Sequence, residues 1–153
     1  MDEQSDLVRE NTHGDANRQL DQQRRADVAR FVGATPADIR RRLQELDREW
    51  DVERALEANA STIMLLSLGL SALHSRRWLV LSGVVPAFLL QHALQGWCPP
   101  IEVFRRLGLR TRREIDAERM ALKALRGDFD GLGATEGDTS ALASRAIAAA
   151  EQR

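Results

Sequence analysis

Two short apolar runs separated by a basic turn constrain this chain more than any other feature. The first run covers residues 58–73 and the second covers residues 79–94, with His74, Arg76 and Arg77 between them. A turn this short joins neighbouring antiparallel helices, and two apolar helices need an apolar medium or a partner to cover them. The sequence therefore predicts an all-α protein with a helical hairpin that hides from water, and a membrane is the simplest place for it.

The length of the runs leaves a second interpretation open. Each run corresponds to roughly 24 Å of helix, whereas the hydrocarbon core of a bilayer is about 30 Å thick. Flanking Leu56, Trp78 and Trp97 can lengthen the span, and local thinning of the bilayer absorbs a few ångströms. The mean hydropathy of the whole chain is only -0.38. The alternative is therefore a soluble helical oligomer that has the hairpin as its core.

Arginine placement predicts the orientation of the hairpin. Five arginines lie in the residues just before the first run and five just after the second, whereas the turn holds two. Because basic residues favour the cytoplasmic side, we expect an inner-membrane protein with both termini cytoplasmic. The first residues lack the basic and apolar regions of a cleaved signal peptide, so insertion is expected to use the hairpin.

Small and polar residues within the runs indicate contacts between helices. Gly69, Ser82 and Gly83 would let helix backbones approach closely in lipid. Gln91 and His92 lie at membrane depth, where polar groups usually face a partner helix. We therefore expect these five residues to pack helix against helix, and we expect homo-oligomers.

The ends of the hairpin are expected to meet the lipid headgroups. Tryptophan favours the membrane interface, and basic side chains are attracted to anionic headgroups. The residues predicted to lie there are Trp78, Trp97, Arg105, Arg106 and Arg110. Asn59 at the entrance of the first run is interpreted as interfacial too, and a polar cavity shared with Gln91 is the alternative.

The flanks of the hairpin carry helix signals. Thr35 suits an N-cap and Pro36 the first helical position, and the helix they open should run to residue 57. Its predicted apolar stripe is Ile39, Leu43, Leu46 and Trp50.

Beyond the hairpin, Thr111 and Glu114 have the spacing of a capping box, and Gly127 suits the end of that helix. Residues 1–34 are too polar to offset the entropy of ordering, although residues 20–31 have some helical character. The chain is thus divided into a disordered tail, an amphipathic helix, the hairpin, further amphipathic helices, and a linker with an alanine-rich helix (1–34, 35–57, 58–97, 98–127 and 128–153).

The second run and its continuation resemble a known domain. The block LSGVVPAFLLQHALQGWCPPIEVFRRLGLRT is similar to the YgaP-like transmembrane domain, a family of unknown function that also occurs fused to rhodanese modules. The matching residues are Leu81, Ser82, Gly83, Gly96, Trp97 and Cys98, within a resemblance that covers residues 59–108. It implies a membrane hairpin and homo-oligomers. The rhodanese module is absent, so sulfurtransferase activity does not carry over.

Cys98 is the only cysteine and the only candidate for covalent chemistry. One interpretation, suggested by the rhodanese association, makes it a persulfide acceptor or redox sensor with a sulfur-carrier or rhodanese protein as partner. The other makes it a small residue packed at a helix end. His92 and Cys98 give only two of the three or four ligands that zinc needs, so no metal or cofactor is expected. A net charge of -1 does not by itself indicate nucleic-acid binding, and no interleaving of aromatic and basic residues suggests it, so none is expected. We expect a structural or interaction module rather than an enzyme.

Overall fold

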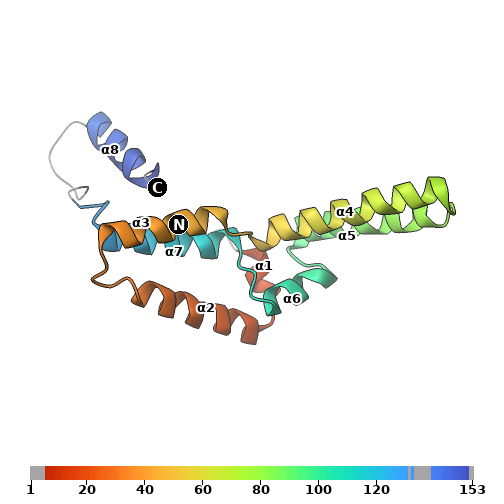
Figure 1. The fold of residues 1–153 in the computed structure, drawn as a ribbon, viewed down its shortest axis with the longest axis horizontal. Coiled ribbons are helices and arrows are strands. Elements are labelled where there is room, and N and C mark those ends of the chain that lie inside the picture. The colour runs from red at the N-terminus through yellow and green to blue at the C-terminus, as the bar shows by residue number, and fades with distance from the viewer. Residues whose placement is uncertain (1–5, 131, 133–138, 152–153) are drawn as a thin grey trace. The chain divides into compact units, whose positions relative to one another are not determined.

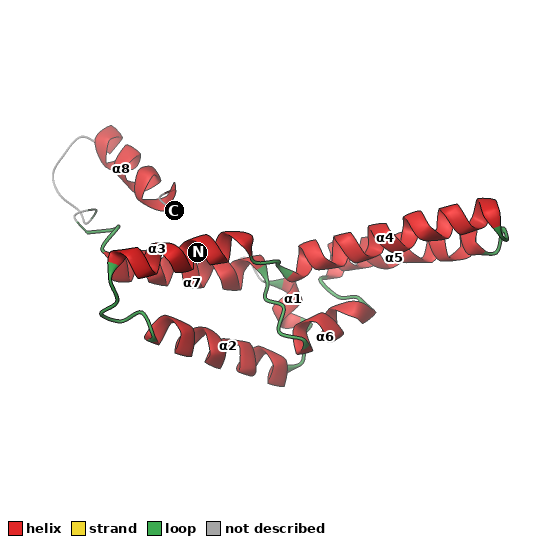
Figure 2. Ribbon diagram, viewed as in Figure 1, coloured by secondary structure: helices red, strands yellow, loops and turns green. Residues whose placement is uncertain are grey.

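Every regular element in the described part of the chain is a helix. The computed structural model describes residues 6–130, 132 and 139–151, and none of these forms a strand (Figure 2). The all-α class is therefore confirmed. The helices are α1 (Leu7–Glu10), α2 (Gly14–Ala29), α3 (Pro36–Arg48), α4 (Val52–Leu73), α5 (Trp78–Gln95), α6 (Pro99–Arg106), α7 (Arg112–Arg126) and α8 (Thr139–Glu151).

The chain folds as two compact units. One consists of Met1–Asp21 with Trp50–Glu114, and the other of Gln22–Glu49 with Ile115–Arg153. Each unit has its own cluster of buried apolar residues. The hairpin and its base belong to the first unit.

In the first unit, α4 and α5 lie side by side as an antiparallel hairpin (Figure 1). The Asp51 carboxylate caps α4 by accepting a hydrogen bond from the Arg54 backbone N–H at 2.7 Å. This cap starts α4 six residues before the apolar run, and the helix reaches 22 residues, or about 33 Å. α5 has 18 residues, or about 27 Å. The predicted helical hairpin is thus present, and its first helix is longer than the apolar run indicated.

The base of the hairpin is closed by two short helices. Val8 from α1 and Ile101 from α6 pack with Val52, Leu56 and Cys98 in one buried cluster. Two of these residues belong to the first turns of α4, so the cluster fixes the helix at the end opposite its turn.

The structure corrects the expected disordered tail. Residues 1–5 lie outside the described residues, but α1 and α2 are helices where a tail to residue 34 was expected. Val8, Ala16 and Leu20 are buried. Composition does not predict these two helices, because the segment has few apolar residues. Polar contacts with residues about 90 to 105 positions away hold much of the segment in place.

In the second unit, α3 begins as predicted. Thr35 accepts a hydrogen bond from the Asp38 N–H at 3.2 Å, and Pro36 opens the helix. The predicted apolar stripe of α3 packs against α7. Its members Ile39, Leu43 and Leu46 form one buried cluster with Ile115 and Leu122.

The predicted continuous helix to residue 57 is wrong. α3 ends at Arg48 and a new helix begins at Val52, because Glu49 has extended backbone and Asp51 caps α4. Trp50 lies in this break and is half exposed, so it does not continue the stripe.

Both predicted signals of the later helix are confirmed. The Thr111 N–H donates to Glu114 Oε2 at 2.8 Å, and the Glu114 N–H donates to Thr111 Oγ1 at 3.3 Å, which is a capping box. Gly127 follows α7 with a φ of +86°. Most of the predicted linker after it lies outside the described residues, and α8 follows.

Candidate membrane-inserting hairpin

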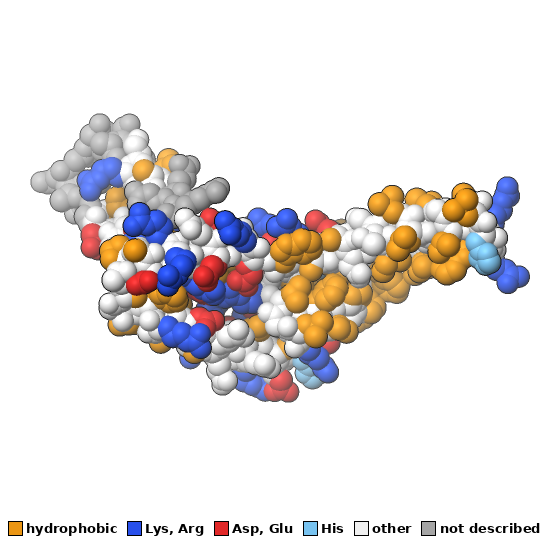
Figure 3. Space-filling view, in the orientation of Figure 1, with side chains coloured by type: hydrophobic (Ala, Val, Ile, Leu, Met, Phe, Trp, Pro, Cys, Tyr) orange, Lys and Arg blue, Asp and Glu red, His pale blue; other side chains and the backbone are white. Residues whose placement is uncertain are grey.

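The hairpin exposes a large apolar surface. No residue of α5 is buried against the rest of the described chain. In the part of α4 that follows Ala60, Ser67 is the one buried residue. Figure 3 shows hydrophobic side chains gathered over this part of the molecule. The most exposed aliphatic side chains of the hairpin are Leu65, Leu66, Leu73, Val80, Leu90 and Leu94, at 62% to 88% exposure. Soluble monomers rarely expose contiguous apolar patches beyond a few hundred Å², so this surface needs a cover.

Two helical segments of the described chain are long and apolar enough to cross a membrane. One lies within Pro36–Leu73 and the other is Trp78–Gln95, each with a stretch of mean hydropathy 1.3. Residues 74–77 join them, and the exposed Arg76 and Arg77 place two positive charges in the turn. An apolar rod that carries charge only at its ends matches the layers of a bilayer.

The two helices meet at a pair of hydroxyl groups. Ser67 on α4 is buried, and its Oγ lies 2.6 Å from the Oγ of Ser82 on α5. Ser82 therefore contacts α4 within the hairpin. Gly69 and Gly83 do not make this contact, because a Cβ built on either meets no described atom within 4 Å. Their backbones lie open on the hairpin surface.

Gln91 and His92 lie half buried in the last turns of α5. The Nδ1 atom of His92 is buried and has no hydrogen-bond partner among the described residues. A buried polar atom without a partner costs free energy, so the hydrogen-bonding capacity of this nitrogen is not satisfied within the hairpin.

The Gly-Trp-Cys-Pro element forms the junction between α5 and the base. Gly96 ends α5 in the left-handed region, with a φ of +70°, and its N–H donates to the His92 carbonyl at 2.7 Å. A Cβ at Gly96 would lie 2.6 Å from the backbone carbon of Leu7. Glycine is therefore required at position 96 for two reasons: the left-handed backbone at the helix end and the close approach of α1.

Cys98 follows as a buried residue with 1% exposure. Burial raises the pKa of its thiol, and the nearby Ile101 backbone N–H offsets only part of this effect. A reactive cysteine needs an accessible thiolate, so the surroundings favour the packing interpretation.

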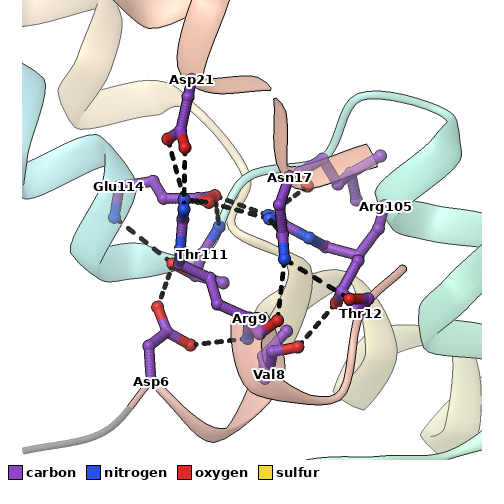
Figure 4. Close-up of polar contacts among 10 residues, drawn as sticks. Asp6, Val8, Arg9, Thr12, Asn17, Asp21, Arg105, Thr111 and Glu114 are labelled. Carbon is purple, nitrogen blue, oxygen red and sulfur yellow. Dashed lines mark hydrogen bonds and ion pairs between the residues drawn. The ribbon is translucent and has the colours of Figure 1, made fainter. Parts of the chain in front are cut away.

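An ion-pair network lies at the base of the hairpin, as Figure 4 shows. Glu114 accepts from Arg105 at 2.5 and 2.8 Å and from Arg9 at 2.5 Å. Arg105 also donates to the Asn17 side chain at 2.8 Å, and Arg9 donates to both oxygens of Asp21 at 2.9 Å. These contacts attach α1 and the start of α2 to α6 and to the first turn of α7.

The network corrects the prediction that Arg105 and Arg110 meet lipid headgroups. Arg105 is 1% exposed and Arg110 is 5% exposed, so neither side chain reaches the surface. Arg106 is exposed and pairs with Glu102, Trp97 is partly exposed, and Trp78 is half buried. These three residues are compatible with an interface, and the two buried arginines are structural.

Sequence reasoning missed the partners of Arg105. Glu114 lies nine positions after Arg105 and Asn17 lies 88 positions before it, and neither spacing places two residues on one helix face. The capping box identified Glu114 as a helix-start residue, but not as the acceptor for two arginines. The cause of its low pKa is nevertheless clear: burial would raise the pKa of Glu114, and the Arg105, Thr111 N–H and Arg9 contacts outweigh burial and lower it.

The chain has no match in comparisons with protein families, with curated proteins and with solved structures. The resemblance to the YgaP-like domain thus stays a prediction. No group of three or more potential metal ligands occurs in the part of the chain that the structure describes.

Proposed function

We propose that this protein is a small integral membrane protein of the inner (cytoplasmic) membrane, held by the α4–α5 hairpin with both termini in the cytoplasm. The observation that carries the proposal is the exposure of most apolar side chains of α5 and of the second half of α4. Covering such a surface with acyl chains removes it from water at no packing cost to the rest of the fold. The balance of arginines supports the orientation.

Its role in this proposal is that of a structural or interaction module that associates with further copies of itself. The open backbones at Gly69 and Gly83 support this, because small residues allow close approach of helices from two molecules in lipid. Membership in the YgaP-like family would fit the same role. Cys98 takes no part in it, since burial and a raised thiol pKa oppose redox chemistry.

Fractionation of cells tests membrane insertion. The wild-type chain should stay in the pellet after an alkaline carbonate wash and leave it only with detergent. The double variant Leu66→Arg with Val84→Arg should shift to the supernatant, because both residues are exposed and lie near the middle of their helices. Each arginine at the centre of a span costs about 2.5–3.5 kcal/mol. Val32→Arg is the matched control, since Val32 is 69% exposed and lies outside the hairpin.

A wild-type chain that stays in the supernatant without detergent would overturn the proposal. If this soluble chain were also oligomeric by light scattering, the hairpin would be the core of a soluble assembly instead.

A further inference from the structure

The base of the hairpin contains a cavity of about 190 Å³. Its walls come from residues within 56–63 of α4, from residues within 85–89 of α5, and from residues 98–100 at the start of α6. If a methylene group takes about the volume of a water molecule in the liquid, ~30 Å³, the cavity has room for about six such groups.

The chemistry of the walls selects an apolar occupant. Pro99 and Pro100 occupy the first positions of α6, and proline has no backbone N–H, so this helix start offers no donor there. Asn59 supplies the one polar side chain among the wall residues that the structure describes. None of the wall residues carries a charged side chain that would bind an anion or a metal ion, whereas the mainly apolar walls suit a hydrocarbon chain.

The cavity also reaches the apolar surface of the hairpin. Phe88 lines it and is at the same time 41% exposed. We propose that the cavity holds a segment of one acyl chain of a phospholipid from the cytoplasmic leaflet. This inference rests on the proposed membrane insertion, because the bilayer supplies the chain.

Photo-crosslinking tests the site in the full chain. The protein is placed in nanodiscs of phosphatidylglycerol that carries a diazirine on one acyl chain, irradiated, and mapped by peptide mass spectrometry. Labelling should concentrate on the cavity walls around Ala60 and Val85. Val85→Trp should reduce this labelling roughly tenfold, the equivalent of about 1.4 kcal/mol of lost affinity. Val84→Trp is the matched control, because Val84 is the neighbouring residue, is 43% exposed and does not line the cavity.

Circular dichroism reports whether Val85→Trp disturbs folding. Ala60→Leu fills the same cavity from α4 and provides a second variant that should reduce the labelling by the same amount. Even labelling along the lipid-facing sides of both helices, unchanged by the two filling variants, would overturn the acyl site while leaving insertion intact. A chain that does not remain with the discs would overturn the proposed insertion itself and the site with it.

Discussion

Glu114 is the residue on which the base of the hairpin depends most. Its carboxylate is 3% exposed and holds Arg9 and Arg105 together. Glu114→Gln should lower the free energy of unfolding by about 3–5 kcal/mol, because it leaves the buried guanidinium of Arg105 without its anion, whereas Arg9 keeps Asp21. Chemical unfolding followed by circular dichroism in detergent measures this. Asp15→Asn removes an exposed pair with Arg18 and should cost less than about 1 kcal/mol.

The same carboxylate makes part of the stability depend on pH. The pKa of Glu114 is lower in the folded chain than in the unfolded chain, so its contribution is present above the ordinary pKa and is lost as pH falls through the folded-state value. The stability difference between wild type and Glu114→Gln should therefore shrink below about pH 4. An equal difference at pH 7 and at low pH would contradict the assigned cause.

Gly96 allows a second test at the scale of one residue. An alanine there must adopt a φ of +70° and meets the backbone of Leu7, so Gly96→Ala should displace α1. Gly108 has a φ of +94° but open space around it, so Gly108→Ala isolates the conformational cost of about 1–2 kcal/mol. Hydrogen exchange of the α1 amides should rise only in the Gly96 variant. Equal exchange in both variants would show that the approach of Leu7 is unimportant.

At the scale of elements, the proposed association of copies can be tested on the outer surface of the hairpin. Gly83→Leu should leave the hairpin folded, since a Cβ at Gly83 meets no described atom, but should weaken contacts between copies. The mass of the detergent-solubilised protein, measured by light scattering, should fall toward that of the monomer. Val84→Leu adds bulk at the exposed neighbouring position and should not change the mass. An unchanged mass for Gly83→Leu would exclude this surface from the oligomer.

The sequence predicted the elements that depend on interactions between residues close in the chain, and it missed those that depend on distant residues. Local signals succeeded: the Thr35 cap, the capping box of Thr111 and Glu114, and the hairpin itself depend on residues within a few positions. The helices of residues 6–29 were missed because they are held by contacts with α6 and α7, which sequence spacing does not reveal. Arg105 was assigned to the headgroups because its charge was visible in the sequence and its partner was not.

For the whole molecule, the buried thiol changes how the orientation in the membrane can be measured. Cys98 is 1% exposed, so an impermeant maleimide would miss it in the folded chain from either side of the membrane. Absence of labelling at Cys98 would therefore carry no information on topology. A Cys98→Ala background with one new, exposed cysteine at a time removes this ambiguity.

In that background, His74→Cys places a thiol in the exposed turn of the hairpin, and Val32→Cys places one in the exposed segment before α3. With both termini cytoplasmic, the turn thiol should react with impermeant maleimide in intact cells, and the Val32→Cys thiol should react only after permeabilisation. A hairpin that spans the bilayer returns both flanks to the same side. If the flanks are cytoplasmic, the turn lies on the outer side. The reverse pattern would invert the orientation, and protection of both thiols in intact cells would mean that the hairpin enters the membrane without crossing it.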